Sequence, residues 1–192
     1  MTGRHDARER ALGATVELLL ERGWIGTTPA AVAERAGAAK MSLYRHFAGK
    51  DELVAAALAR FSTTQRRWLL GPDTDPPRDR LLGAFTRIAE RARAGGLAAG
   101  CPFVATRLQS PDRDGPAATL ALAHKNDVAA AFARLLEQLG HPDPADTGEA
   151  LLVLLDGAIV HAAMSGNDGP VLVAARAAAT LIDAGTPAGT GP

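Results

Sequence analysis

The chain has 192 residues, of which 47% are hydrophobic and 22% charged, enough for one compact unit or a small domain on a larger one. Its 21 basic and 21 acidic side chains give a formal net charge of zero, which excludes a uniformly basic protein. The single cysteine, Cys101, excludes an intramolecular disulfide and suits a reducing cytoplasm.

The N-terminus lacks the apolar segment of a secretion signal. No run of residues approaches the roughly 18 apolar positions that a membrane span needs. We therefore expect a cytoplasmic protein with no membrane association. Because β-branched residues are sparse, the composition favours an all-helical fold.

The first predicted helix covers residues 6–22, after a loose arm over residues 1–7. Its apolar stripe has helical spacing, and Gly23 ends it. The stripe consists of Leu12, Val16, Leu19 and Leu20. Trp24 is expected to pack beneath the elements that follow.

Residues 27–50 predict two short helices joined at Gly37. Thr27 and Thr28 can cap the first of them, and Pro29 suits its first turn. The second, over about residues 39–47, carries polar and basic side chains that can contact phosphates and base edges. A helix, a glycine turn and a polar second helix form the helix-turn-helix arrangement.

Residues 4–64 contain an ordered set of residues: Gly23-Trp24, Thr27-Thr28, Val32-Ala33, Ala36-Gly37, Leu43-Tyr44-Arg45-His46-Phe47, Lys50 and Glu52-Leu53. With this set, the segment resembles the DNA-binding domain of the TetR family of transcriptional regulators. The sequence departs from the common pattern at Met41, where glycine is frequent, and at Pro29, where a larger side chain is common. These departures concern the operator sequence rather than DNA binding.

The rest of the chain predicts further helices separated by loops rich in glycine and proline. They cover about residues 50–70, 77–94, 103–108, 116–139, 144–164 and 170–183. About nine helices in all match an N-terminal three-helix helix-turn-helix domain, residues 1–49, followed by a helical ligand-binding and dimerisation domain, residues 50–184. Residues 185–192 are expected to form a flexible tail.

The resemblance implies a DNA-contacting set on the two short helices: Thr27, Thr28, Lys40, Met41, Ser42, Tyr44, Arg45, His46 and Lys50. Thr28, Tyr44, His46 and Lys50 match phosphate contacts, and Lys40, Met41, Ser42 and Arg45 match positions near base edges. The charge distribution agrees, because residues 1–93 contain 16 Lys and Arg against 11 Asp and Glu. Each of these side chains could instead be core, cap or solvated surface.

A homodimer is expected, because one helix-turn-helix domain, here called a head, makes too few contacts for tight binding to a palindromic double-stranded operator. Small residues on the predicted helices 144–164 and 170–183 allow close helix approach in a four-helix bundle from two subunits. The same faces could instead pack within one subunit.

A small-molecule effector site is expected among the helices between residues 50 and 164. Its candidate residues are mostly apolar with a few polar groups, as ligand pockets are: Phe61, Thr64, Trp68, Phe85, Phe103, Arg107, His124, Asp127, Phe132 and His161. The same set of residues is also typical of an ordinary helical core that binds no ligand. Since no phosphate-cradling glycine loop is present, a largely apolar ligand is expected.

The function that the resemblance implies is a homodimeric repressor that a small molecule releases from its operator. Alternatives are a ligand or thiol sensor that activates transcription or acts without DNA release, and a small helical enzyme. A nucleophilic site could combine Cys101 with His124 and Asp127, but the sequence has no nucleophile-elbow or oxyanion-hole motif. No histidine pair has i, i+4 spacing. We therefore expect no catalytic residues, no metal site and no cofactor.

Overall fold

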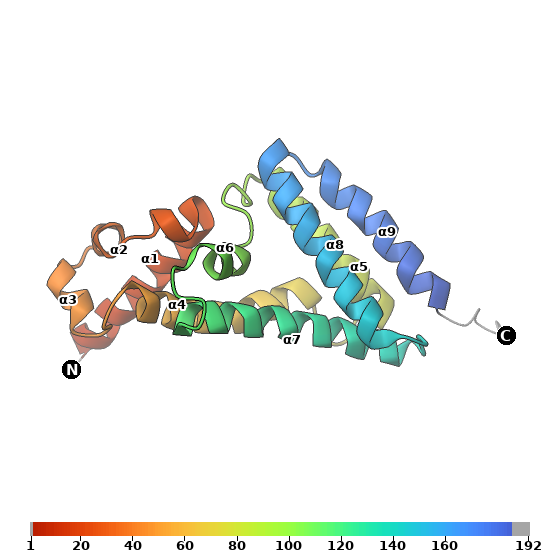
Figure 1. The fold of residues 1–192 in the computed structure, drawn as a ribbon, viewed down its shortest axis with the longest axis horizontal. Helices are drawn as coiled ribbons and strands as arrows, with labels where there is room; N and C mark the ends of the chain where they lie inside the picture. Colours follow the sequence, from red (N-terminus) through yellow and green to blue (C-terminus); the bar gives the residue numbers. More distant parts are fainter. Residues whose placement is uncertain (1, 186–192) are drawn as a thin grey trace. The chain divides into compact units, whose positions relative to one another are not determined.

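The computed structural model describes residues 2–185, with side chains from Ala7 onward, and this range contains nine helices and no strand. The helices are α1 (Thr2–Gly26), α2 (Pro29–Arg35), α3 (Lys40–Tyr44), α4 (Lys50–Leu70), α5 (Pro77–Arg93), α6 (Pro102–Gln109), α7 (Pro116–Gln138), α8 (Pro144–Ser165) and α9 (Gly169–Gly185), in the order that Figure 1 shows. The all-helical prediction is confirmed. The predicted tail lies almost wholly outside the described residues.

The first helix differs from its prediction at both ends. It begins at Thr2, within the segment predicted as a loose arm, where no proline prevents helical backbone angles. At its other end it kinks at Gly23, with φ 65° and ψ −170°, and one more turn follows to Gly26. Glycine adopts a positive φ without the penalty that a Cβ brings, so the predicted stop is a kink.

The contacts divide the described chain into two compact units. The first contains the residues up to Thr64 together with Leu97–His124, and the second contains Gln65–Gly96 together with the residues from Lys125. Helices α4 and α7 therefore each contribute to both units. The functional boundary predicted at residues 49 and 50 remains a prediction.

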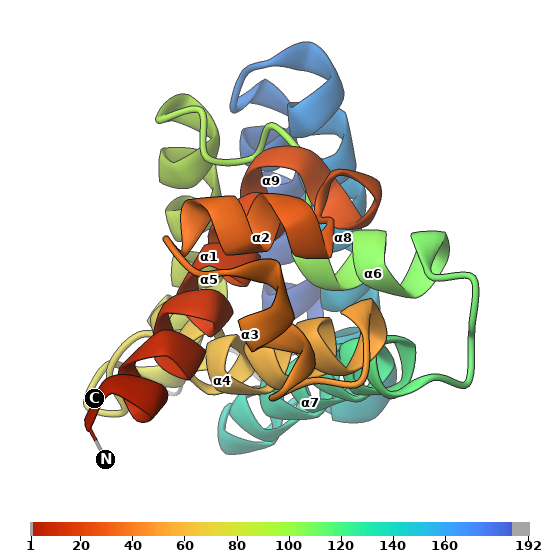
Figure 2. The same cartoon turned by 90° about the vertical axis from the view of Figure 1, so that its left-hand side faces the viewer.

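In the first unit, the three N-terminal helices lie close together (Figure 2), and their buried side chains belong to one apolar cluster. Its buried members come from α1 to α4 and from the turns after α2 and α3: Ala11, Leu12, Ala14, Leu18, Val32, Ala33, Ala36, Leu43, Phe47, Leu53 and Ala57. Arg35 joins α2 to α1 by donating to Glu21 at 2.8 Å and to Glu17 at 3.2 Å. A second cluster includes Trp24, Leu58 and Phe103.

In the second unit, α8 lies beside α9, and α5 packs against both (Figure 1). Two ion pairs join α5 to the ends of α9: Arg93 to Asp168 at 2.5 Å and Arg78 to Asp183 at 2.8 Å. The Arg78 guanidinium, through its hydrogen bond, lowers the pKa of the Asp183 carboxyl. The largest fully buried side chains of this unit are Phe85, Phe132, Leu81, Leu136, Leu151, Leu155 and Ile182.

Within the described range, α8 alone is long and apolar enough to cross a membrane, judged by length and composition. The sequence search for an unbroken apolar run missed it, because polar residues interrupt the helix. A core helix of a globular protein passes the same test, and α8 buries Leu151, Leu155 and Ile159 within its unit.

Candidate nucleic-acid interface

The turn between α1 and α2 is held by two threonines with different surroundings. Thr28 is exposed and caps α2, because its hydroxyl oxygen accepts from the Ala31 N–H at 3.2 Å, and Pro29 follows at the first helical position. Thr27 is buried, and its hydroxyl donates to the Gly23 carbonyl at 2.8 Å. Of the two predicted DNA contacts, the structure therefore presents the Thr28 side chain to solvent and uses Thr27 inside the fold.

The turn between α2 and α3 depends on Gly37, which has φ 60°. The N–H of Ala38 donates back to the Ala33 carbonyl at 2.9 Å and closes the end of α2. Arg10 of α1 donates to the Ala36 carbonyl at 3.2 Å and satisfies another terminal group. Sequence analysis missed the role of Arg10, because a basic residue on an amphipathic helix has the same pattern when it is only solvated.

Helix α3 has one buried side and one exposed side. Leu43, and Phe47 just beyond the helix, are each 4% exposed and join the core of the first unit. The exposed predicted contacts are Lys40, Met41, Tyr44 and Arg45, with Ser42 and His46 half-buried between them. Met41 is 73% exposed and Tyr44 is 44% exposed, and their spacing of three residues places an apolar and an aromatic side chain on the same face of α3.

The exposed side chains of α3 are partly ordered by one another. Arg45 donates to the Ser42 hydroxyl at 3.1 Å. The Lys40 ammonium lies 6.0 Å from the centroid of the Tyr44 ring, at the outer limit of a cation–π contact. This face therefore combines hydrogen-bond donors, two cations and an aromatic ring.

Lys50, at the start of α4, contacts the turn after the α1 kink. Its ammonium donates to the Trp24 carbonyl at 2.5 Å and lies 4.4 Å from the centroid of the Trp24 ring. Partial burial lowers the pKa of the Lys50 amine through desolvation. An ammonium has three donors, so this contact leaves others for a phosphate.

Among the predicted effector residues of the first unit, three come together in an aromatic stack. Phe103 lies between Phe61, at 5.9 Å between ring centroids, and His124, at 3.6 Å. The Ser62 hydroxyl lies 2.7 Å from His124 Nδ1. Arg107 instead donates to the Arg113 carbonyl, and Thr64 is exposed.

The predicted effector residues of the second unit have different surroundings. Trp68 lies under the Arg91 guanidinium, 3.7 Å from the ring centroid. Asp127 accepts from Arg66 at 2.6 Å, and Phe85 and Phe132 are fully buried. His161 is exposed on α8.

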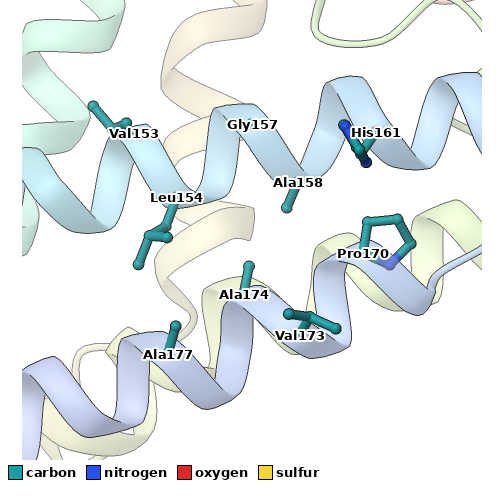
Figure 3. Close-up of a pocket in the computed structure, with 9 residues that line it drawn as sticks. All are labelled: Val153, Leu154, Gly157, Ala158, His161, Pro170, Val173, Ala174 and Ala177. Carbon is teal, nitrogen blue, oxygen red and sulfur yellow. The ribbon is translucent and has the colours of Figure 1, made fainter.

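A groove between α8 and α9 has a volume of about 580 Å³ (Figure 3). Its lining is apolar apart from one histidine: Val153, Leu154, Gly157, Ala158, His161, Pro170, Val173, Ala174 and Ala177. Val153 is 63% exposed and Val173 58% exposed, so this face presents apolar side chains to water. The sequence predicted a dimer surface from the small residues of these helices and did not identify the exposed valines.

No group of three metal-ligating side chains was found among the described residues. Cys101 is half-buried and packs against the cluster that contains Trp24 and Phe103.

Comparison with known proteins places this geometry in a family. Residues 11–57 match the family model described as bacterial regulatory proteins of the tetR family. A solved TetR transcriptional regulator from Streptomyces avermitilis is 32% identical, with a TM-score of 0.81 over 93% of this chain and 97% of that one. The chain belongs to the TetR family of transcriptional regulators, which are not enzymes.

Two further similarities differ in what they show. The reduced form of NemR from Escherichia coli, 22% identical with a TM-score of 0.81 over 97% of this chain and all of that one, shares the fold. An HTH-type transcriptional repressor from Mycobacterium tuberculosis strain H37Rv is 32% identical over 99 residues, 52% of this chain and 53% of the relative. The chain therefore matches the curated relatives over about half of their length.

Proposed function

We propose that this protein is a DNA-binding transcriptional regulator that acts in the cytoplasm as a homodimeric repressor. The observation that carries the proposal is the exposed face of α3, with Lys40, Met41, Tyr44 and Arg45 on a helix whose other side is fixed in the core. A helix held in this way can enter a major groove as a rigid element. The repressor named among the relatives supports the direction of regulation.

The predicted roles of the side chains follow their positions. Arg45 and Lys40 can donate to guanine, and the exposed Met41 side chain can pack on a thymine methyl. Phosphate contacts are assigned to Thr28, Tyr44, His46 and Lys50. Of the remaining predicted contacts, Ser42 positions Arg45, and Thr27 supports the turn from inside.

The α8–α9 face supports the proposed dimer. Its apolar groove and exposed valines would be covered if a second copy placed the same surface against it about a two-fold axis. The four helices would then form a bundle. Two heads fixed in this way would read the two halves of a palindromic operator.

A small, largely apolar effector is proposed to release the DNA. The stack of Phe61, Phe103 and His124, with Ser62 hydrogen-bonded to the histidine, combines apolar side chains with a polar group in the same unit as α3, as ligand pockets do. An effector that prefers the conformation with low DNA affinity must weaken operator binding by the same factor by which DNA weakens effector binding.

Fluorescence anisotropy with the DNA that flanks the protein's own gene tests the proposal. We expect saturable binding that weakens as the salt concentration rises. If Arg45 contacts a base, Arg45→Ala should lose about 1–3 kcal/mol of binding free energy. Arg134→Ala, which removes an exposed arginine on α7, is the matched control and should bind as the wild type does. Equal binding of Arg45→Ala and the wild type to that DNA would contradict the assigned interface. Addition of flat aromatic dyes to the protein–DNA complex then tests whether an apolar ligand releases the DNA.

A further inference from the structure

The groove between α8 and α9 contains one ionisable side chain. His161 is the single titratable residue among those that line it, and its ring lies beside Pro170 at the start of α9 (Figure 3). Around it the surface is apolar, with Val173 on the facing helix and Ala158 one turn earlier on α8. In a single protomer the His161 side chain is exposed to water.

We infer that His161 makes dimerisation depend on pH, so that protonation of its imidazole opposes association of the two copies. The inference rests on the proposed α8–α9 dimer. It concerns a regulatory property of that interface, because the same residue would enter the interface once from each copy.

The physical reason is the loss of water around a charge. A second copy that covers the groove removes water from His161, and burying a charge without a partner is costly. The structure offers no such partner in the groove lining. Histidine changes charge between about pH 5 and 8, so the neutral form is available for burial at the upper end of this range.

Asp156 and Asp168 are the carboxylates nearest in sequence to the residues that line the groove, and each already has a basic partner. On α8, Asp156 accepts from Lys125 at 2.5 Å. At the start of α9, Asp168 accepts from Arg93 of α5, and Asp183 at the other end accepts from Arg78. The exposed Arg176 of α9 is a cation. The N-terminal end of α9, beside Pro170, carries the positive end of the helix dipole, which also disfavours an imidazolium.

The sign of the effect follows from linkage. The dimer binds protons at His161 less readily than the separated protomers do, so the affinity between protomers is full at high pH and falls as the pH decreases. Two histidines are covered in each dimer. We therefore expect the dimer dissociation constant to rise roughly 10- to 100-fold between about pH 7.5 and about pH 5.5.

Sedimentation of the full chain from nanomolar to micromolar concentration, at constant ionic strength and at both pH values, tests this expectation. His161→Gln keeps a polar side chain without titration and should dimerise equally at both. His141→Gln removes a histidine of the α7–α8 loop outside the groove and should keep the wild-type response. Far-UV circular dichroism at each pH establishes that every sample compared is folded.

The outcomes separate the inference from the dimer proposal. A wild-type dimer with the same dissociation constant at both pH values overturns the inference and leaves the dimer intact. A His161→Gln variant with the full wild-type response also overturns it, because another group would then be responsible. A wild type that is monomeric at about pH 7.5 overturns both.

Discussion

Lys50 is placed to have two roles, one inside the fold and one on DNA. Its ammonium contacts the Trp24 carbonyl and ring, so Lys50→Ala should lower the free energy of unfolding by about 1 kcal/mol. As a predicted phosphate contact, it should also lower the slope of log affinity against log salt by about one. Chemical denaturation and anisotropy over a salt series measure the two effects.

Lys40→Ala is the matched comparison, since Lys40 is exposed on α3. Because Lys40 is assigned to a base rather than a phosphate, Lys40→Ala should weaken binding at one base step, with little change in the salt slope and little loss of stability. If Lys50→Ala loses stability while its salt slope stays that of the wild type, the lysine only fixes the start of α4 to the last turn of α1, and the phosphate assignment is wrong.

Thr28 likewise combines a helix cap with a predicted phosphate contact, and two substitutions separate these roles. Thr28→Ala removes the cap on α2 and should cost about 1 kcal/mol of stability. Thr28→Asp keeps a capping oxygen but places a negative charge near the predicted phosphate, so it should retain stability and lose DNA affinity. Thermal unfolding and fluorescence anisotropy distinguish the two roles. If Thr28→Asp binds DNA as tightly as the wild type, Thr28 is not part of the DNA interface.

At the level of single residues, sequence reasoning identified the exposed face of α3 but not its internal contacts. The spacing of Leu43 and Phe47 indicates which side is buried, and so leaves Lys40, Tyr44 and Arg45 outside. The contact of Lys50 with Trp24 joins residues 26 positions apart. Such a contact depends on tertiary packing, which helical periodicity does not encode.

At the level of elements, α1 and α2 are joined by an exposed ion pair whose strength should depend on pH. The hydrogen bond from Arg35 lowers the pKa of the Glu21 carboxyl. Since the folded value lies below that of an unfolded glutamate, near about 4.3, the contribution is present above that pH and is lost as the pH falls through the folded value. Glu21→Gln should therefore be less stable than the wild type at neutral pH, with the difference decreasing as the pH falls below about 4.3.

Urea unfolding at neutral pH and in acid measures this difference in the free energy of unfolding. Glu34→Gln, an exposed glutamate of α2, is the control. A deficit for Glu21→Gln that persists unchanged in acid would mean that the carboxylate charge is not the cause.

Helix boundaries were predictable where the sequence marks them strongly. Proline stands at the first or second position of α2, α5, α6 and α8, and α4 begins at the predicted Lys50. The beginning of α1 was not predictable, because residues 2–5 contain neither a cap pattern nor an apolar stripe. The sequence pattern does not separate effector residues from core residues, since Phe85 and Phe132 have the pattern of ordinary core and are fully buried; the effector site remains a prediction.

At the level of the whole molecule, the dimer proposal needs a substitution that leaves the protomer folded. Ala158 and Ala178 are two of the small residues on these helices, but they are 6% and 0% exposed, so a charge there would disturb the protomer itself. Val173 lines the groove and is 58% exposed. Val173→Glu should therefore fold normally and separate the copies, because the new carboxylate would be buried in the interface twice.

Sedimentation at micromolar concentration should show Val173→Glu as a monomer, and its operator affinity should fall by at least about 100-fold, because one head then binds without the other. Leu122→Glu places the same charge on an exposed apolar residue of α7, outside the groove, and should remain a dimer. If both variants stay dimeric, the α8–α9 face is not the interface. If Val173→Glu is monomeric but binds a palindromic operator as tightly as the wild type, the heads do not act together.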